Sequence, residues 1–346
     1  MRSVFFVGLL VAIPVLAEPF SLDTIVPAKL PATMKPPKGM PSEVLAIFAP
    51  QRGDRIDCLA LRPDGKYLAL GGPDQNVRLW DLEKTRLAAT LKLPTPVVCL
   101  AFSPDGKTLT IGDSNGNIRI HKNEGGGSYL FKSMLVAHKD MPIWSLTFSP
   151  DGGRLYSAAR DKSAAVWDIS KPKAVKTGSL DGHEVEVRSL SLSADGELAA
   201  TAGNQDLTIR LWNLSGEKPK VAGSLKLSER VVSIGLAPDG KTLAVGGARG
   251  IPAIYERGGE KLKKLAALET GGHAATSIGY SPDGSQIVGT SGLSGTEDRV
   301  LVWDSKGAIQ HEFKYGLHLH AVAFTPDGRH LIVLTESEAM IVRLPK

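Results

Sequence analysis

Short apolar segments recur along the chain from residue 42 to the C-terminal region. Seven of them stand directly before a polar turn, alternate small with large side chains and carry no charge: Cys58–Leu61, Cys99–Phe102, Ser145–Phe148, Ser189–Leu192, Ser233–Leu236, Ser277–Tyr280 and Ala321–Phe324. A short uncharged apolar run bounded by turn residues is typical of a strand buried on both faces. The pattern therefore predicts an all-β chain.

The turn that follows each apolar run is nearly the same seven times. Its copies are Pro-Asp-Gly, with Ala replacing Pro once, and their aspartates are Asp64, Asp105, Asp151, Asp195, Asp239, Asp283 and Asp327. Neighbouring aspartates are 41, 46, 44, 44, 44 and 44 residues apart. Pro presets φ for a type I turn, Asp bonds its own backbone and Gly takes the positive φ, so each turn joins two antiparallel strands. The fixed period indicates a repeat architecture.

Each repeat contains signals for three more strands, such as Tyr67–Gly71, Val77–Trp80 and Arg86–Leu91 in the first. Four-stranded sheets repeated around an axis are the blades of a β-propeller, so we predict a seven-bladed propeller over residues 42–346. The seventh repeat ends after its third strand. Glu43–Phe48 resembles a fourth strand, and we expect it to complete the last blade and remove both exposed edges.

Several dipeptides occur at fixed places in these repeats. Trp-Asp is found at Trp80-Asp81, Trp167-Asp168 and Trp303-Asp304, and Gly-His at Gly182-His183 and Gly272-His273. With these motifs in order and at this period, the chain resembles the WD-repeat family over residues 42–346, as an exported bacterial member.

The resemblance implies a hydrogen-bond chain of His, Ser or Thr, Asp and Trp inside a blade. Repeat three supplies His138, Ser157, Asp161 and Trp167 at the matching offsets; repeat four nearly matches with His183, Thr201, Asp206 and Trp212. A His–Ser–Asp set is also typical of a hydrolase triad. The structural interpretation is favoured, because a buried indole N–H, hydroxyl and imidazole each need a partner.

The N-terminal residues have the pattern of a targeting signal. Arg2 precedes the apolar run Val4–Leu16, and Val15-Leu16-Ala17 fits a cleavage site, so we predict a signal peptide over 1–17. An uncleaved membrane anchor or a buried helix is the alternative. Residues 18–41 are rich in proline and predict an extended tether, which either holds the domain off a surface or lies across its side. We therefore expect an exported protein, located in the periplasm, in the cell envelope or outside the cell.

Charge and cysteine content narrow the function classes. The chain has 41 basic and 36 acidic residues, a net charge of +5 spread over every repeat, whereas nucleic-acid binding favours a clustered basic stripe. Cys58 and Cys99 occupy equivalent small positions and are expected to be free thiols, with a disulfide as the alternative. His318 and His320 are too few for a metal site. We expect no metal, no cofactor, no nucleic acid, no membrane segment in the mature chain, and a monomer.

One position of the repeat varies in residue type, although the positions next to it are uniformly small or apolar. Seven residues before each turn aspartate stand Asp57, Val98, Trp144, Arg188, Val232, Thr276 and His320. Packing alone does not produce this contrast, but a ring of side chains at the mouth of the central channel does. The resemblance places the loops leading into the first strands on that face, opposite the turns. Arginines on these loops form a basic rim suited to an acidic partner or an anionic glycan.

These observations predict a non-catalytic protein-interaction scaffold that binds an unidentified protein partner through the channel-mouth face. The predicted partner-binding residues are Arg55, Asp57, Trp144, Arg160, Arg188, Arg230, Arg249 and His320. No catalytic residue is predicted, because no paired carboxylates, phosphate loop or nucleophile elbow occurs. The alternative is an exported hydrolase or lyase that acts on a glycan or peptide in the channel mouth.

Overall fold

The computed structural model describes residues 22–25, 43–49, 55–247, 252–259, 261–292, 298–315 and 318–345. The expected signal peptide, Arg249 and all of the expected tether except residues 22–25 lie outside these ranges. The regular secondary structure of the described residues is β-strand throughout, apart from one 3₁₀ turn, η1 (Leu22–Thr24). The all-β prediction is confirmed for this part of the chain. Among the described residues, no helix is long and apolar enough to cross a membrane.

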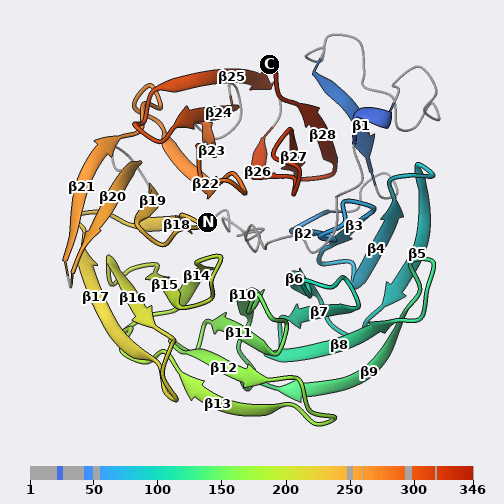
Figure 1. Ribbon diagram of the computed structural model, residues 1–346. Helices are drawn as coiled ribbons and strands as arrows, with labels where there is room; N and C mark the ends of the chain where they lie inside the picture. Colours follow the sequence, from blue (N-terminus) through green and yellow to red (C-terminus); the bar gives the residue numbers. More distant parts are fainter. Residues whose placement is uncertain are drawn as a thin grey trace.

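Sheets of antiparallel strands surround a common centre, with the first strand of each repeat innermost (Figure 1). Repeats one to three form β2 (Cys58–Leu61), β3 (Tyr67–Gly71), β4 (Asn76–Asp81), β5 (Arg86–Lys92), β6 (Val97–Phe102), β7 (Thr108–Asp113), β8 (Asn117–Asn123), β9 (Tyr129–Val136), β10 (Ile143–Phe148), β11 (Arg154–Ala159), β12 (Ala164–Asp168) and β13 (Val175–Ser179). Repeats four and five form β14 (Val187–Leu192), β15 (Leu198–Gly203), β16 (Thr208–Asn213), β17 (Lys220–Lys226), β18 (Val231–Leu236), β19 (Thr242–Gly247), β20 (Ala253–Gly258) and β21 (Lys261–Ala267). Repeats six and seven form β22 (Ala274–Tyr280), β23 (Gln286–Gly292), β24 (Asp298–Asp304), β25 (Ile309–Tyr315), β26 (Leu319–Phe324), β27 (His330–Thr335) and β28 (Ala339–Arg343).

The sheets are four-stranded, with one exception. Among the described residues, repeats four and five share an eight-stranded sheet, because β17 and β21 meet in a single parallel pair, Ser224 with Lys261. The other sheets each hold four antiparallel strands in sequence order or, for the last, the order β1-β28-β27-β26. This arrangement is consistent with a β-propeller.

The ring is closed by β1 (Val44–Phe48), which pairs antiparallel with β28. The prediction that the N-terminal strand completes the last sheet is confirmed. All five residues of β1 are buried, and the Phe48 ring lies 5.5 Å from that of Trp80 in an edge contact. The first and last repeats therefore share one apolar core, in which Leu45 and Phe48 meet Leu59, Trp80 and Ile341.

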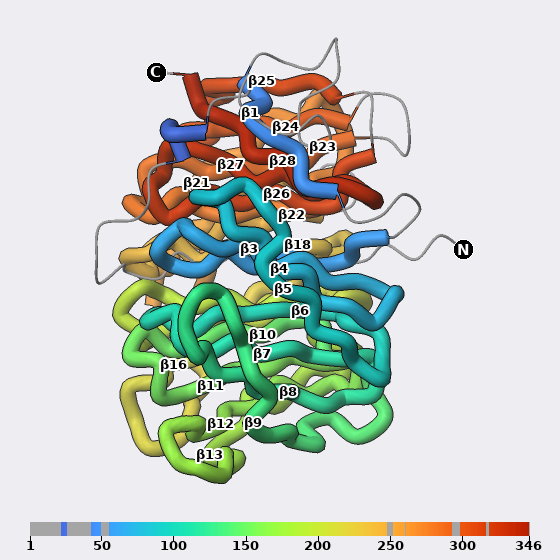
Figure 2. Tube along the Cα trace, turned by 90° about the vertical axis from the view of Figure 1, so that its right-hand side faces the viewer, coloured from blue at the N-terminus to red at the C-terminus, as the bar shows by residue number. Residues whose placement is uncertain are grey.

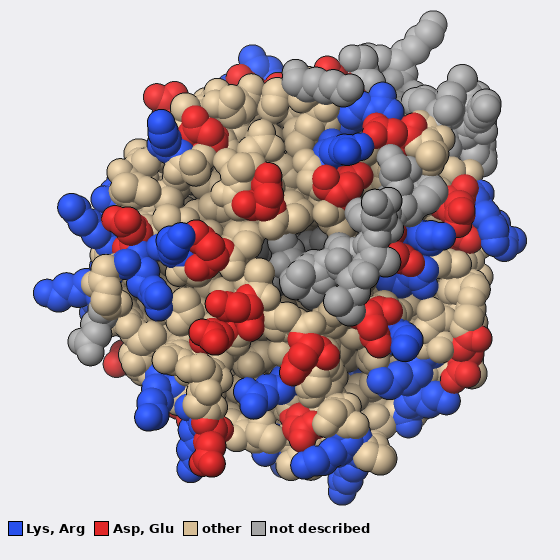
Figure 3. All heavy atoms as spheres, in the orientation of Figure 1, with Lys and Arg blue, Asp and Glu red and all other residues tan. Residues whose placement is uncertain are grey.

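The two faces of the ring differ in the ends of the strands and the turns that they present. The C-terminal end of β28 and η1 lie on the face that Figure 1 turns toward the reader, at the left in Figure 2. Because neighbouring strands are antiparallel, the Pro-Asp-Gly turns lie at that same end, and we call this side the turn face. The opposite side, where the innermost strands begin, is the channel-mouth face. On the turn face, acidic side chains gather around the centre while many basic ones lie further out (Figure 3).

The turns pack against one another from repeat to repeat. Gly196 has a φ of 72°, and a Cβ added there would lie 2.7 Å from Cδ of Pro150, the proline of the preceding turn. Gly284 lies in the same way beside Pro238, with a distance of 3.2 Å. The backbone conformation favours glycine in these turns, and at Gly196 the neighbouring turn also leaves no room for a Cβ.

Small residues near the start of the innermost strands have a second role. The hydroxyls of Ser189, Ser233 and Ser277 accept the backbone N–H groups of Ile234, Ile278 and Val322 in the next repeat, at 3.2, 3.3 and 3.2 Å. The Cys99 thiol donates to the Ile143 carbonyl at 3.2 Å. Cys58 and Cys99 are both free and buried, so the disulfide alternative is not realised. Burial raises the pKa of both thiols.

We predict that Gly196→Ala lowers the free energy of unfolding by about 1–3 kcal/mol, because alanine strains this backbone and meets Pro150. The control is Gly216→Ala, where the nearest atom to an added Cβ is 3.7 Å away and φ is not in the left-handed region. Denaturant unfolding of both variants measures the difference. Equal stabilities would show that the turns do not pack as described.

Candidate functional site: the channel mouth

The four predicted network residues of repeat three form a continuous chain of hydrogen bonds. Trp167 Nε1 donates to Ser157 Oγ at 2.9 Å, and Ser157 Oγ lies 2.7 Å from His138 Nε2. His138 Nδ1 lies 2.8 Å from Asp161 Oδ2. Because the Ser157 oxygen accepts from the indole, its proton is directed to Nε2, and Nδ1–H faces the carboxylate. Burial acts to raise the pKa of Asp161, but hydrogen bonds from His138 and Ser163 hold it below its usual value.

Repeat four contains the same chain despite its one-residue offset. His183 Nδ1 lies 2.8 Å from Asp206 Oδ2, and its Nε2 lies 2.9 Å from Thr201 Oγ1, which accepts Trp212 Nε1 at 2.8 Å. Ser157 and Thr201 are fully buried. A substrate cannot reach either hydroxyl, so the arrangement serves to satisfy buried polar groups between strands.

We expect His138→Ala to lower the free energy of unfolding by about 1–3 kcal/mol, because Ser157 and Asp161 lose their partner in a buried setting. Trp167→Phe should be destabilising in the same direction. Thermal and denaturant unfolding measure both changes. If His138→Ala abolished an activity with the melting temperature unchanged, the structural role would be wrong.

Repeat two lacks this chain and places His121 where the tryptophan is expected. His121 is 6% exposed, its ring contacts Phe131 edge-on at 5.7 Å between centroids, and its Nδ1 has no hydrogen-bond partner among the described residues. Burial, and secondarily the charge of Arg119, lowers the pKa of His121 to about 4. The imidazole is thus held neutral in the folded protein.

This pKa predicts an acid-sensitive contribution to stability. The unfolded histidine binds a proton below about pH 6.5, whereas the folded one stays neutral down to about pH 4, so stability falls as the pH drops through this window. Between pH 7 and 4.5, wild type should lose on the order of 1–3 kcal/mol more than His121→Phe. Urea unfolding at several pH values measures the two slopes. Identical slopes would contradict a neutral buried His121.

The variable position of the repeats coincides with a β-bulge. In β6, β10, β14, β18, β22 and β26, the pairing with the next strand passes over one residue; these residues are Val98, Trp144, Arg188, Val232, Thr276 and His320. A bulge leaves its extra residue out of the ladder and re-aims its side chain. This explains how a variable residue adjoins uniformly small or apolar ones at the start of the innermost strands.

Trp144 and Arg188 lie together on the channel-mouth face. The guanidinium carbon of Arg188 lies 4.8 Å from the centre of the Trp144 ring, a cation–π contact between neighbouring repeats. Arg188 also bonds Glu186, with its Nε and Nη2 each 2.8 Å from Oε1. Trp144 is half-buried, and its Nε1 is buried with no partner among the described residues.

The contacts continue into the next repeats. Asn204 Nδ2 donates to Glu186 Oε1 at 2.8 Å, and Arg230 Nη2 donates to Asn204 Oδ1 at 2.9 Å. We call these five residues, Trp144, Glu186, Arg188, Asn204 and Arg230, the mouth network. Sequence reasoning missed Glu186 and Asn204. The Glu186-x-Arg188 spacing was the available signal for the first, since alternate residues of an extended segment share a side.

The other predicted residues lie around the seam of the first and last repeats. Arg55 Nε donates to Asp57 Oδ1 at 2.7 Å, and burial raises the pKa of Asp57 although Arg55 opposes this. The rings of His318 and His320 lie 5.1 Å apart. Burial, followed by the charges of His318 and Arg55, lowers the pKa of His320 to about 4.

The remaining predicted residues add little to either group. Arg160 is exposed, and Arg249 lies outside the described residues. The mouth is not uniformly basic, because Asp57 and Glu186 neutralise two of its arginines. Within the part of the chain that the structure describes, no group of three or more His, Cys, Asp or Glu side chains is placed to hold a metal ion.

Comparison with known proteins identifies the repeats. The family model "WD domain, G-beta repeat" matches residues 86–122, 130–168 and 174–213. The model of the anaphase-promoting complex subunit 4 WD40 domain matches residues 42–103. The chain therefore contains WD40 repeats, as the Trp-Asp and Gly-His motifs indicated.

The relatives described next are fungal proteins. Nuclear distribution protein PAC1 of Arthroderma otae is 24% identical over 331 residues, which cover 92% of this chain and 65% of that protein. Nuclear distribution protein PAC1-2 of Uncinocarpus reesii is 28% identical over 298 residues, covering 83% and 58%. Mitochondrial division protein 1 of Pyricularia oryzae is 42% identical, over 81 residues only. The chain spans less than two thirds of the length of the first two relatives.

These relatives correct the expected location. The prediction of an exported protein, in the periplasm, in the cell envelope or secreted, is wrong, because the proteins similar over most of the chain are fungal nuclear distribution proteins. They give no support for a bacterial origin either. The physical reason for the error is that an apolar run after a basic residue is a weak and purely local signal.

Proposed function

We propose that this protein is a non-catalytic, monomeric interaction scaffold that binds a protein partner through its channel-mouth face. The observation that carries the proposal is the mouth network, which joins three neighbouring repeats by side chains placed at or beside β-bulges. Residues that stabilise the fold, such as those of the Pro-Asp-Gly turns, recur from one repeat to the next. The mouth residues differ between most units, with valine alone occurring twice, as a surface that fits a particular partner requires.

We further propose that the ring has seven blades. The eight-stranded sheet counts as two blades, because its halves join through one parallel residue pair while each half has its own complete antiparallel ladder. Seven turn motifs in the sequence support this count.

The chemistry of the mouth suits a folded or extended protein surface of mixed charge. Tryptophan and arginine are the side chains most often found as anchors in protein interfaces. Here Arg188 is held by Glu186 and Trp144, and Asn204 orients Glu186 and Arg230. Side chains fixed before binding lose less conformational entropy in the complex.

A second candidate function, a hydrolase or lyase in the channel mouth, draws on one observation. Asp57 and His320 have pKa values shifted in opposite directions near the seam, and such shifts gather at catalytic sites. Both shifts have burial as their largest cause, however, and Asp57 already accepts a bond from Arg55. The scaffold accounts for these residues without a reaction.

The proposal is tested by crosslinking in cells that make the protein. The variant Trp144→Ala with Arg188→Gln should lose a partner that wild type captures, with a melting temperature within a few degrees of wild type. The matched control is Phe131→Ala with Lys132→Gln, which removes an exposed aromatic ring and a cation from the outer strand β9. The control should capture the partner as wild type does.

Two results would contradict the proposal. Retention of every partner by the mouth variant would exclude this face as the binding surface. Turnover of a glycan or peptide that is lost in His320→Gln or Asp57→Asn, at unchanged stability, would establish the enzyme instead.

A further inference from the structure

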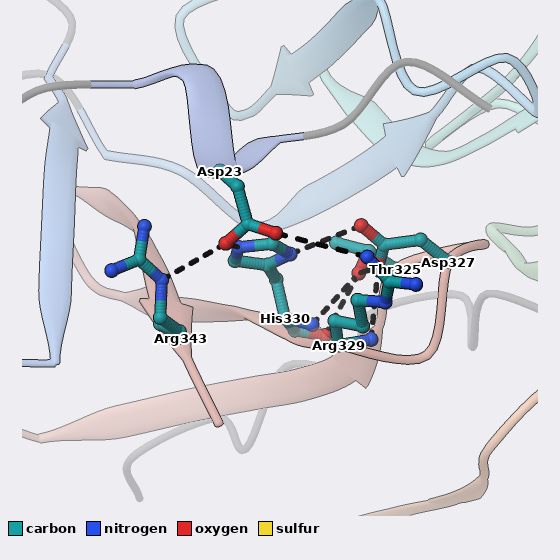
Figure 4. Close-up of polar contacts among 6 residues, drawn as sticks. All are labelled: Asp23, Thr325, Asp327, Arg329, His330 and Arg343. Atoms are coloured by element: carbon teal, nitrogen blue, oxygen red, sulfur yellow. Dashed lines mark hydrogen bonds and ion pairs between the residues drawn. The ribbon is translucent and has the colours of Figure 1, made fainter. Parts of the chain in front are cut away.

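The segment Leu22–Ile25 occupies a groove between the last and first repeats on the turn face. Leu22 is 1% and Ile25 4% exposed, and both share one buried apolar cluster with Leu82, Ile332 and Ile341. Between them, Asp23 points to a basic group (Figure 4). Its carboxylate lies 3.0 Å from Arg343 Nε, 3.3 Å from His330 Nε2 and 3.9 Å from Arg329 Nη1. The groove thus holds two apolar side chains with a charged one between them.

The strand registers identify the equivalent groove at another seam. His330 pairs with Arg343 and Ile332 with Ile341 in the last sheet, as Arg154 pairs with Asp168 and Tyr156 with Val166 in repeat three. In the following repeats, Leu82 and Leu214 each come directly after the third strand. The groove between repeats three and four is therefore built from the same positions as the one that holds Leu22–Ile25.

At this second seam the groove is an open cavity. Its volume is about 450 Å³, and Tyr156, Val166 and Leu214 contribute to its lining as the apolar counterparts of Ile332, Ile341 and Leu82. Pro219 and Gly178 bring its outer walls together, since a Cβ on Gly178 would lie 3.1 Å from Pro219 Cδ.

The charge of the open groove is opposite to that of the filled one. Asp168 stands in place of Arg343, Gly153 in place of Arg329, and Arg154 in place of His330. Asp151 and the exposed Glu217 add two further carboxylates to the lining. Asp168 bonds Ser170 and lies 3.2 Å from Lys171, so part of its charge is already compensated. The lining remains net acidic.

We propose that the groove between repeats three and four binds a short peptide segment of a partner, with a lysine or arginine between two apolar side chains. The apolar side chains pack into the cavity that Tyr156, Val166 and Leu214 help to line, at the places where Leu22 and Ile25 pack at the other seam. The basic side chain pairs with Asp168 and Glu217, in the place where Asp23 meets Arg343. This site lies on the turn face and is independent of the channel mouth.

The test uses two fluorescein-labelled peptides and the full chain. One peptide copies residues 20–27, and the other copies them with Asp23→Lys. In anisotropy titrations, the lysine peptide should bind at least about tenfold more tightly than the unchanged one, because a basic side chain matches the acidic lining.

Three variants locate the binding. Glu217→Lys should weaken binding of the lysine peptide by about fivefold or more, since it reverses an exposed charge of the lining. Thr177→Trp, which fills the groove from β13, should abolish it. Glu184→Lys is the matched control, a charge reversal at an exposed residue beside His183, away from the groove, and should leave binding unchanged.

Several outcomes would overturn the proposal. These are no saturable binding of the lysine peptide at about 1 mM, equal affinity for both peptides, or an affinity that Glu217→Lys leaves unaltered. Melting temperatures show whether Thr177→Trp is folded; if it is not, the comparison of Glu217→Lys with Glu184→Lys decides.

Discussion

The antiparallel pairing of β1 with β28 is the constraint on which the rest of the ring depends. Without it the last sheet would end in an unpaired strand, and Phe48 would lose its contact with Trp80 in the first repeat. The pairing joins residues almost 300 positions apart in the chain and places the first and last repeats side by side. The bulged residues of six repeats stand at equivalent positions near the start of their innermost strands, so the candidate site is built from several repeats of one closed ring.

Much of this fold was predictable because short sequence motifs that recur in each repeat determine it. The Pro-Asp-Gly turns fix φ and chain direction within three residues, and the apolar runs before them mark strands buried on both faces. The closing strand and the His138–Trp167 chain were also predictable, the first from a missing fourth strand and the second from family offsets. Each of these features can be found by comparing the order of residues in one repeat with that in the others, without knowing the contacts between repeats.

What sequence reasoning missed depends on contacts between repeats. The role of Ser189, Ser233 and Ser277 as acceptors for the next strand was invisible, because a small side chain was a sufficient explanation. Asn204 was missed because it joins Glu186 to Arg230 across a seam between repeats. Glu186 was missed although it lies only two residues from its partner Arg188. A basic rim was therefore expected where carboxylates and amides pair with the arginines.

The seams explain how one scaffold offers different surfaces at equivalent places. The walls of each groove come from the second and third strands of one repeat and from the loop after the third strand of the next. Closure brings residues 22–25 to only one such seam, and there the charges of Arg329 and Arg343 match Asp23. At the seam of repeats three and four the strand registers match, but Asp168 stands in place of Arg343 and the lining is net acidic. An open groove on the same face as an equivalent one that the chain itself fills is best understood as a site whose occupant comes from another molecule.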